Sequence, residues 1–287
     1  MQDVVVIGRG PAGTSAAIYA ARANLSVVVI AHDDGALSRA DKINNYYGFP
    51  SPVGGKELIK YGIEQAKSLG VKFIDGEVTS ISYDGSFTVV TGSEKIEAKC
   101  VVLATGAPRK KPDIQNIEVF TGAGVSYCAI CDAFFFRGAD VAVLGNGQYA
   151  LNELNELLPV VRSAKVLTNG EKASVVFPQG VEIIDKKISS LEGDGFLQKV
   201  VFEDGTDIEI SGLFIALGVA GGNELAKKLG ILTVNNSIVV NENKETNIPG
   251  VYAVGDCTEG LRQVAKAVSD GAIAGVKIAE FIRKSKK

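Results

Sequence analysis

The chain of 287 residues is long enough for two domains that each bury a hydrophobic core. Its 46% hydrophobic and 22% charged residues are ordinary for a globular protein, and a formal net charge of −3 argues against nucleic acid as the main partner. No apolar run approaches the ~20 residues of a membrane span, so we expect no membrane association. The first predicted strand, residues 3–7, leaves no room for a signal peptide, and we therefore expect a soluble, cytoplasmic protein.

The first predicted strand leads into a glycine-rich turn and an alanine-rich helix. Glycines permit the tight turn, the close approach of a pyrophosphate and close packing of helix on strand, and the phosphate then lies at the positive end of the helix. Placed between a strand and a helix, this motif predicts a dinucleotide site; a purely structural turn is the alternative. The residues expected to bind the dinucleotide are Gly8, Gly10, Pro11, Ala12 and Gly13.

The next predicted strand, residues 27–30, ends in an acidic segment. Asp33 or Asp34 could accept the ribose hydroxyls of the dinucleotide, and the pattern does not choose between them. His32 lies either near the ribose or in an exposed loop. A later strand of the same half, residues 101–104, ends at Thr105 and Gly106.

A pair of cysteines, Cys128 and Cys131, is followed at once by Asp132. Four cysteines are few for a disulfide scaffold, and a close pair in a reducing compartment is typical of a catalytic or metal site. The pair supplies only two ligands of a tetrahedral zinc site and the single histidine is remote, so we expect no metal. Two thiols at this spacing can close a small disulfide ring, and a neighbouring acid can manage the proton that exchange requires; a structural disulfide is the alternative.

The strand, glycine turn and helix then recur in residues 141–158, with a late strand at residues 213–217, which indicates an internal duplication of a nucleotide-binding fold. A further buried strand at residues 251–254 is expected to return to the first domain. The pattern predicts an α/β fold of two Rossmann-like nucleotide-binding domains, the second inserted in the first. The expected domains are 1–112 with 247–287, and 117–241 with the cysteine pair, and the short polar segments 111–117 and 241–249 are expected to be the paired hinges between them.

After that last strand, Gly255 and Asp256 place a carboxylate where it can accept hydrogen bonds from sugar-like hydroxyls; a helix cap is the alternative. Arg262 and Gln263 open a helix whose N-terminus favours negative charge, such as that of a reduced flavin ring. The other two cysteines, Cys100 and Cys257, are interpreted as inert packing residues.

Together these segments resemble the low-molecular-weight flavin thioredoxin reductases over essentially the whole chain. The resemblance rests on residues 8–13 with 19–23, on residues 128–132 with 134–137, and on Gly255-Asp256 with Arg262-Gln263. It implies an FAD domain interrupted by a smaller domain that carries the cysteine pair, thioredoxin as the partner, and a homodimer.

The resemblance also implies roles for single residues. Cys131 would face the flavin, Cys128 would attack the thioredoxin disulfide, and Asp132 would protonate a leaving thiolate. The remaining residues expected to bind FAD are Asn45, Thr105, Gly106, Gly255, Asp256, Arg262 and Gln263.

The second glycine loop departs from the members that use NADPH. Those members follow it with an arginine cluster that binds the 2'-phosphate, whereas residues 165–171 here contain no arginine. Tyr149 places a bulky side chain in the loop, and residues 219–222 lack the usual histidine and proline. Glu171 could instead receive the 2'-hydroxyl of NADH, so an NADH-dependent enzyme stays open.

Residues 35–37 are one residue shorter than the corresponding family segment, and Tyr46 and Tyr47 follow Asn45. A tyrosine here would cover the flavin or pack within its loop. These departures resemble the ferredoxin-dependent flavin thioredoxin reductases. Because ferredoxins are generally acidic, we expect a basic docking surface. Each candidate taken singly is interpreted as a solvated charge group unless the candidates cluster in space. The candidates are Arg109, Lys110, Lys111, Arg162, Lys165, Lys186 and Lys187.

The sequence therefore predicts an FAD-dependent thioredoxin reductase that takes electrons from reduced ferredoxin and passes them through the cysteine pair to thioredoxin. FAD accepts electrons singly or as a pair, so it suits either type of donor. The alternatives are an NADH-dependent disulfide reductase of the same fold, a flavin dithiol oxidase and a redox-sensing flavoprotein.

Overall fold

The computed structural model describes residues 1–287 except 93, 107–111, 128, 218–221, 236 and 286–287. The chain forms two compact units, of which unit 1 comprises residues 1–109 and 221–287 and unit 2 comprises residues 110–220. The elements of unit 1 are β1 (Gln2–Ile7), α1 (Pro11–Arg22), β2 (Val27–Ala31), η1 (Ala36–Arg39), α2 (Gly55–Ser68), β3 (Lys72–Asp75), β4 (Val78–Tyr83), β5 (Phe87–Thr91), β6 (Glu94–Leu103), α6 (Gly222–Lys228), β15 (Thr233–Val234), β16 (Ser237–Ile238), β17 (Val251–Ala253), η3 (Gly255–Cys257) and α7 (Val264–Lys284). The elements of unit 2 are α3 (Ile117–Phe120), β7 (Val125–Ser126), α4 (Ala129–Asp132), η2 (Ala133–Phe136), β8 (Asp140–Leu144), α5 (Gln148–Leu157), β9 (Ser163–Leu167), β10 (Glu182–Ile184), β11 (Ile188–Glu192), β12 (Lys199–Phe202), β13 (Asp207–Glu209) and β14 (Gly212–Ile215).

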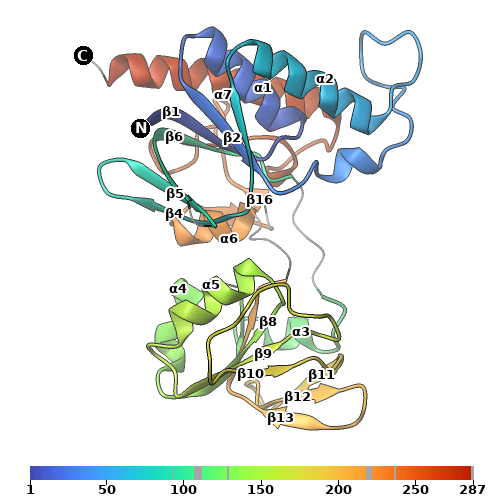
Figure 1. The fold of residues 1–287 in the computed structure, drawn as a ribbon, viewed down its shortest axis with the longest axis vertical. Coiled ribbons are helices and arrows are strands. Elements are labelled where there is room, and N and C mark those ends of the chain that lie inside the picture. Colours follow the sequence, from blue (N-terminus) through green and yellow to red (C-terminus); the bar gives the residue numbers. More distant parts are fainter. Residues whose placement is uncertain (93, 107–111, 128, 218–221, 236, 286–287) are drawn as a thin grey trace. The chain divides into compact units, whose positions relative to one another are not determined.

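The main sheet of unit 1 has the order β3-β2-β1-β6-β5-β4, with β17 also paired to β6 (Figure 1). Strands β1, β2, β3, β6 and β17 are parallel, whereas β4 and β5 form an antiparallel extension. One edge of the long strand β6 pairs with β5 over residues 94–98 and with β17 over residues 101–103. The chain therefore returns to the sheet of unit 1 after unit 2.

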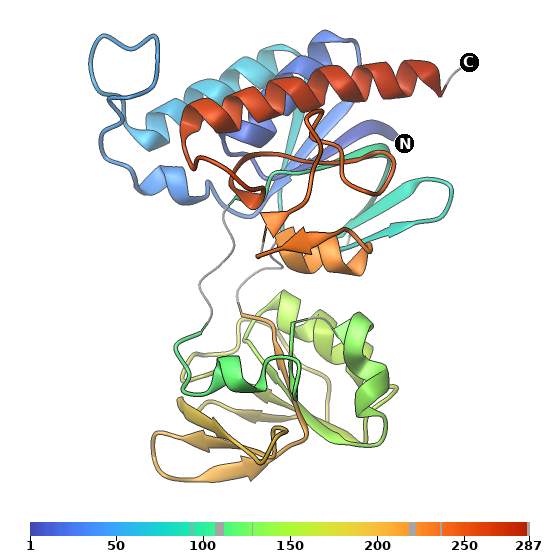
Figure 2. The same cartoon turned by 180° about the vertical axis from the view of Figure 1, so that it is seen from behind.

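Helices α1 and α7 lie side by side on one face of this sheet (Figure 2). Small residues make the close approach possible, because a Cβ on Gly271 would lie 2.2 Å from the Ala12 carbonyl oxygen. A Cβ on Gly275 would likewise lie 2.7 Å from the Ala16 oxygen. Apolar side chains of β1, β2 and β6 fill the space beneath the two helices.

Unit 2 is built on a parallel sheet of order β10-β9-β8-β14-β7. Helices α4 and α5 lie on one face of it and the antiparallel sheet β11-β12-β13 on the other (Figure 1). Leu144 and Leu213 of the parallel sheet share a core with Leu191 and Phe202 of the antiparallel sheet.

The same local geometry occurs in both units. A Cβ on Gly8, directly after β1, would lie 2.2 Å from the oxygen of Ala104, the residue after β6. A Cβ on Gly145, directly after β8, would lie 2.2 Å from the oxygen of Ala216, the residue after β14. Each glycine turn thus crosses the end of its late strand, which confirms the predicted pair of Rossmann-like folds with one inserted in the other.

The second crossing between the units differs from the expected one. Residues 222–241, which the sequence assigned to the inserted domain, belong to unit 1, where α6 lies against β4 and Ile238 forms a bridge with Thr258. The polar segment 241–249, expected to be the hinge, is instead a turn in which Asn241 Oδ1 accepts hydrogen bonds from the Asn243 and Glu245 amides. Polarity marked a tight surface turn rather than a linker.

Within the described residues, no helix is both long and apolar enough to cross a bilayer.

Candidate functional site

The first glycine loop forms a cradle at the start of α1. Gly8 has a positive φ of 110°, and a Cβ on Gly13 would lie 2.0 Å from the Gly8 carbonyl oxygen, so both positions require glycine. A Cβ on Gly10 would meet no atom within 4 Å, which leaves room above the loop. Gly10 provides no side-chain cap and the first turn of α1 carries no acidic residue. The helix start therefore suits an anionic group such as a pyrophosphate.

Both candidate ribose-binding acids after β2 accept hydrogen bonds from other residues of unit 1. Asp34 accepts a hydrogen bond of 2.7 Å from Nε of Arg9, a residue of the glycine loop, and Asp75 at the end of β3 binds the same guanidinium. Asp33 accepts from the Gly35 amide at 2.9 Å. His32 is exposed. The sequence interpretation missed Arg9, whose only local signal is a charged residue between two loop glycines.

Several residues predicted to bind the flavin do come together in unit 1. Asn45 Nδ2 donates a 2.9 Å hydrogen bond to Gln263 Oε1, although the two residues are far apart in the chain. Gly255 lies against the first loop, since a Cβ there would be 2.8 Å from the Ala12 Cβ. Burial raises the pKa of the Asp256 carboxyl above its ordinary value. The start of α1 and the Gly255 turn thus lie against each other.

The late strand β6 delivers Thr105 and Gly106 to the same end of the sheet. Thr105 Oγ1 is buried, and Gly106 has a φ of 76°. The neighbouring Cys257 is also buried, and burial raises the pKa of its thiol to about 11. Burial raises the pKa of the Cys100 thiol to about 12. Both thiols are therefore protonated at neutral pH, as expected for packing residues.

A buried ion cluster supports the Gly255 turn. Asp270 of α7 is 3% exposed and lies 2.8 Å from Lys244 Nζ and 2.9 Å from Lys266 Nζ. Asp270 also accepts from the Gly255 amide at 3.1 Å, and Lys266 donates to the Gly255 carbonyl at 2.7 Å. The sequence interpretation missed this cluster. Its signal is the Lys266–Asp270 spacing of four on an otherwise small and apolar helix face.

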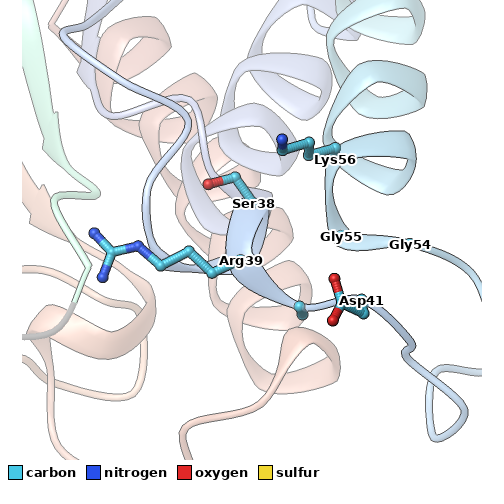
Figure 3. Close-up of a pocket in the computed structure, with 7 residues that line it drawn as sticks. Ser38, Arg39, Asp41, Gly54, Gly55 and Lys56 are labelled. Carbon is cyan, nitrogen blue, oxygen red and sulfur yellow. The ribbon is translucent and has the colours of Figure 1, made fainter.

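A shallow pocket in unit 1 lies between η1 and the start of α2 (Figure 3). Ser38, Asp41 and Lys56 line it, while the Arg39 side chain extends away from Lys56. The pocket follows directly on residues 35–37, the segment that differs from the family pattern.

The cysteine motif lies in unit 2 at α4. Cys128 and the side chain of Cys131 lie outside the described part of the structure. Asp132, the predicted acid, accepts a 2.7 Å hydrogen bond from Ser126 Oγ. The amide of Ala129, the residue after Cys128, donates a 2.6 Å hydrogen bond to Oε2 of the buried Glu153. Glu153 and Ser126 were not predicted, because nothing local links them to the motif.

Two aromatic residues directly after the motif are exposed. Phe134 is 68% exposed and Phe135 is 80% exposed, and Arg137 lies 5.2 Å from the centre of the Phe134 ring. Exposed aromatic and arginine side chains are typical of protein-binding surfaces.

The second glycine loop contacts its own chain. Asn146 Nδ2 donates to Glu171 Oε2 at 2.8 Å and to the Lys172 carbonyl at 3.2 Å. The Ser174 amide donates to the Asn146 carbonyl at 2.8 Å. Tyr149 does not lie over the loop as expected: it is 2% exposed, and its hydroxyl donates to the Tyr127 carbonyl at 3.3 Å. The segment that contacts this loop is therefore residues 171–174 and not Tyr149.

Three of the expected basic docking residues of unit 2 are engaged in ion pairs. Arg162 pairs with Asp140 and Lys165 pairs with Glu182. Lys186 pairs with Asp204 at 2.8 Å. Arg109, Lys110 and Lys111 lie outside the described residues. These pairs lower the net positive charge that the sequence suggested for this surface.

Comparison with known proteins identifies the family. Residues 2–271 match the pattern of the pyridine nucleotide-disulphide oxidoreductases. A thioredoxin reductase from Aquifex aeolicus is 34% identical over 99% of this chain and 94% of its own length. The crystal structure of the atypical thioredoxin reductase TRi from Desulfovibrio vulgaris Hildenborough is 38% identical, with a TM-score of 0.93 and 99% of each chain covered. That of a ferredoxin-flavin thioredoxin reductase from Clostridium acetobutylicum is 31% identical, with a TM-score of 0.75 and 99% and 98% covered.

The cradle in unit 1 fits the FAD that such proteins bind. The open space at Gly10 and the uncapped start of α1 suit its pyrophosphate. The buried Thr105 hydroxyl and the half-buried Asp256 provide polar groups near the same turn. The match along nearly the whole chain, together with this cradle, shows that the protein is an FAD-binding member of the pyridine nucleotide-disulphide oxidoreductases and belongs to their thioredoxin reductase group.

Proposed function

We propose that the protein reduces the disulfide of a thioredoxin with the Cys128/Cys131 dithiol and that its electrons come from a ferredoxin-type donor. The observation that carries the first part is the redox motif itself, held at α4 by hydrogen bonds at both ends in a chain of the thioredoxin reductase group. Bound FAD would accept single electrons from the donor and would provide the pair of electrons that a disulfide needs.

The exchange step needs two thiols and a proton source. The Cys128 thiolate attacks one sulfur of the thioredoxin disulfide, so that a mixed disulfide forms and a thioredoxin thiolate leaves. Asp132, oriented by Ser126 Oγ, is positioned by its place in the motif to protonate that leaving group. Attack of Cys131 on the Cys128 sulfur then releases thioredoxin as a dithiol and leaves the enzyme disulfide to be reduced again.

Three groups of residues are proposed to hold FAD in unit 1. The loop residues Gly8, Gly10, Pro11, Ala12 and Gly13 receive the pyrophosphate. Thr105, Gly106, Gly255 and Asp256 bind the sugar-like part, and Asn45, Arg262 and Gln263 lie beside the ring. The Asn45–Gln263 hydrogen bond supports the last group because it fixes the two segments together.

The second glycine loop supports a donor other than NADPH or NADH. The Glu171 carboxylate, which an NADH ribose would require, already accepts a hydrogen bond from Asn146. The Ser174 amide donates a hydrogen bond to the carbonyl oxygen of Asn146. The similarity to a ferredoxin-flavin thioredoxin reductase agrees with a one-electron protein donor. The lysines and the arginine of unit 2 that form ion pairs do not add support.

Single-cysteine variants test the exchange step. The probe is a thioredoxin whose second active-site cysteine is serine and whose first carries a thionitrobenzoate group. Attack by Cys128 in Cys131→Ser should release thionitrobenzoate and leave a covalent complex with thioredoxin, whereas Cys128→Ser should give neither. Cys100→Ala, which alters a buried thiol of the β6 core, is the matched control and should behave as the parent. Equal complex formation by Cys128→Ser would refute the assigned nucleophile.

A further inference from the structure

The Arg9 side chain crosses the carboxyl end of the sheet in unit 1. The strand order β3-β2-β1 puts two inter-strand spacings, about 10 Å in all, between the loop of Arg9 and the end of β3. Arg9 spans this distance, because its Nε donates to Asp34 Oδ1 at 2.7 Å and its Nη1 donates to Oδ1 of Asp75, the last residue of β3. Ligands of such sheets bind outside the carboxyl ends of the strands. The Arg9 cluster, which is Arg9 with Asp34 and Asp75, therefore lies at the ligand-binding end of the sheet.

Arg9 also belongs to the loop that forms the cradle. The Thr14 hydroxyl donates to the Arg9 carbonyl at 2.9 Å and fixes the backbone of Arg9 against the first turn of α1. The Arg9 side chain is only 18% exposed, so its guanidinium is held by the two acids and does not extend into solvent. A Cβ on Gly10, the next residue, would meet no atom within 4 Å. A pyrophosphate in that space would have the Arg9 cluster as its neighbour.

The charges of the cluster fit such a neighbour. Two acidic side chains beside a pyrophosphate would repel it. Burial by itself lowers the pKa of the Arg9 guanidinium, but hydrogen bonds to Asp75 and Asp34 outweigh burial, and the pKa is raised. Arg9 thus offsets the charge of the acids and leaves carboxylate oxygens that can accept hydrogen bonds from hydroxyls.

The hydrogen bonds distinguish the two acids that follow β2. Asp33 Oδ1 accepts from the Gly35 amide at 2.9 Å and closes a turn within its own loop. Asp34 instead faces the glycine loop through Arg9, and it uses only Oδ1 for this bond. A carboxylate accepts hydrogen bonds at both of its oxygens, so Oδ2 can bind a ribose hydroxyl while the ion pair is kept.

We propose that Arg9 is a positioning residue for the adenosine half of FAD, because it orients Asp34 so that Oδ2 accepts a hydrogen bond from the adenosine ribose. Asp75 holds the other side of the guanidinium. This inference deepens the proposed function and rests on its placement of the pyrophosphate on the first glycine loop. It gives a role to the charged residue between two loop glycines.

The test measures, by calorimetric titration of the full-length apoprotein, the binding of FAD and of an FAD analogue whose adenosine lacks both ribose hydroxyls. The parent should bind FAD about tenfold more tightly than the analogue, because a hydrogen bond to a charged group is lost. Asp34→Ala and Arg9→Gln should each weaken FAD binding about tenfold and bring the ratio of the two affinities to within about twofold of unity. Arg22→Gln, which changes an exposed arginine in the last turn of α1, is the matched control and should keep the parent values.

The ratio separates positioning from a merely structural role. A structural role for Arg9 would weaken both ligands by the same factor, and an unchanged ratio in Arg9→Gln would overturn the proposal. A parent that does not discriminate between the ligands would overturn it too. The double variant Arg9→Gln/Asp34→Ala should bind FAD within about twofold of Asp34→Ala, because the two residues act as a unit. Should Arg9→Gln fail to fold, Arg9→Lys decides: lysine lacks the fixed fork of arginine, so the ratio should fall between the two values, and the parent's ratio would overturn the proposal.

A further variant tests the placement of the pyrophosphate separately. Gly10→Glu puts a carboxylate into the space at Gly10 and should abolish FAD binding if the pyrophosphate lies there. If Gly10→Glu loses FAD while Arg9→Gln keeps the parent's ratio, then only the role of Arg9 fails. If Gly10→Glu binds FAD as the parent does, then the proposed placement fails, and a loss of the ratio in Arg9→Gln would still support the role of Arg9. Neither readout uses thioredoxin or an electron donor.

Discussion

Asp270 shows how one buried residue organises the cofactor end of unit 1. Its carboxylate joins Lys244, Lys266 and the Gly255 amide. Lys244 has a positive φ of 65°, a conformation that costs energy for a residue with a side chain. The ion pair with Asp270 therefore helps to hold the turn that Lys244 occupies, beside the strand that leads into Gly255.

Asp270→Asn should destabilise the fold by roughly 3 kcal/mol at neutral pH, because it leaves two half-buried lysines without their counter-charge. Urea unfolding of apoprotein measures this, with the exposed Asp84→Asn as the control. Burial by itself raises the pKa of Asp270, but hydrogen bonds from Lys244 and Lys266 outweigh it, and the pKa in the folded state is lowered.

The direction of that shift fixes the pH dependence. A carboxyl with a lowered folded-state pKa stabilises the protein fully above its unfolded pKa of about 3.9, and the contribution is lost as pH falls through the folded-state value. The difference between parent and Asp270→Asn should thus shrink below about pH 4. A difference that grows on acidification would contradict this assignment.

At the scale of elements, the contact between α1 and α7 joins stability to cofactor binding. Gly271→Ala would bring a Cβ within 2.2 Å of the Ala12 carbonyl oxygen, which belongs to the first glycine loop. Since the obstacle is backbone, α1 must move, and we expect a loss of about 1–3 kcal/mol in stability together with weaker FAD retention.

Gly62→Ala is the matched control within α2. A Cβ there meets only a Thr14 methyl group at 3.4 Å, so the better helix propensity of alanine should raise stability by about 0.5–1 kcal/mol. Thermal unfolding and the ratio of flavin to protein absorbance report both effects. Equal behaviour of the two variants would show that α1 and α7 are not closely packed.

The elements that the sequence predicted are those with local signals. The valine runs of β1 and β2 and the glycines after β1 and β8 follow one another within a few residues, so strand, turn and helix could be assigned. Contacts that depend on distant segments could not be assigned. The pairing of Arg9 with Asp34 and Asp75, and that of Glu153 with Ala129, require the folded arrangement.

Two interpretations failed for the same reason. Tyr149 was expected to cover the second loop because a large side chain follows its glycines, yet the helix turns it toward Tyr127. The polar segment 241–249 was expected to be a hinge, yet asparagine side chains tie it into a turn of unit 1. In each case the size or polarity of the side chains was interpreted correctly, but the contacts that they make depend on tertiary neighbours.

At the scale of the whole molecule, the two copies of the Rossmann-like fold differ in the surroundings of their glycine loops. The glycine loop of unit 1 keeps open space at Gly10 for a dinucleotide. The loop of unit 2 instead binds residues 171–174 of its own chain, and the following helix contacts the redox motif. The homodimer, the cytoplasmic location and the ferredoxin partner stay predictions.

The most direct test of this account is the anaerobic flavin spectrum of the FAD-loaded protein on addition of NADPH, NADH or reduced ferredoxin. Bleaching by ferredoxin alone, followed by recovery of the oxidised spectrum on addition of thioredoxin disulfide, is the predicted result. Rapid bleaching by either nicotinamide nucleotide would contradict the account, because it would show that the loop contacted by residues 171–174 still accepts a dinucleotide.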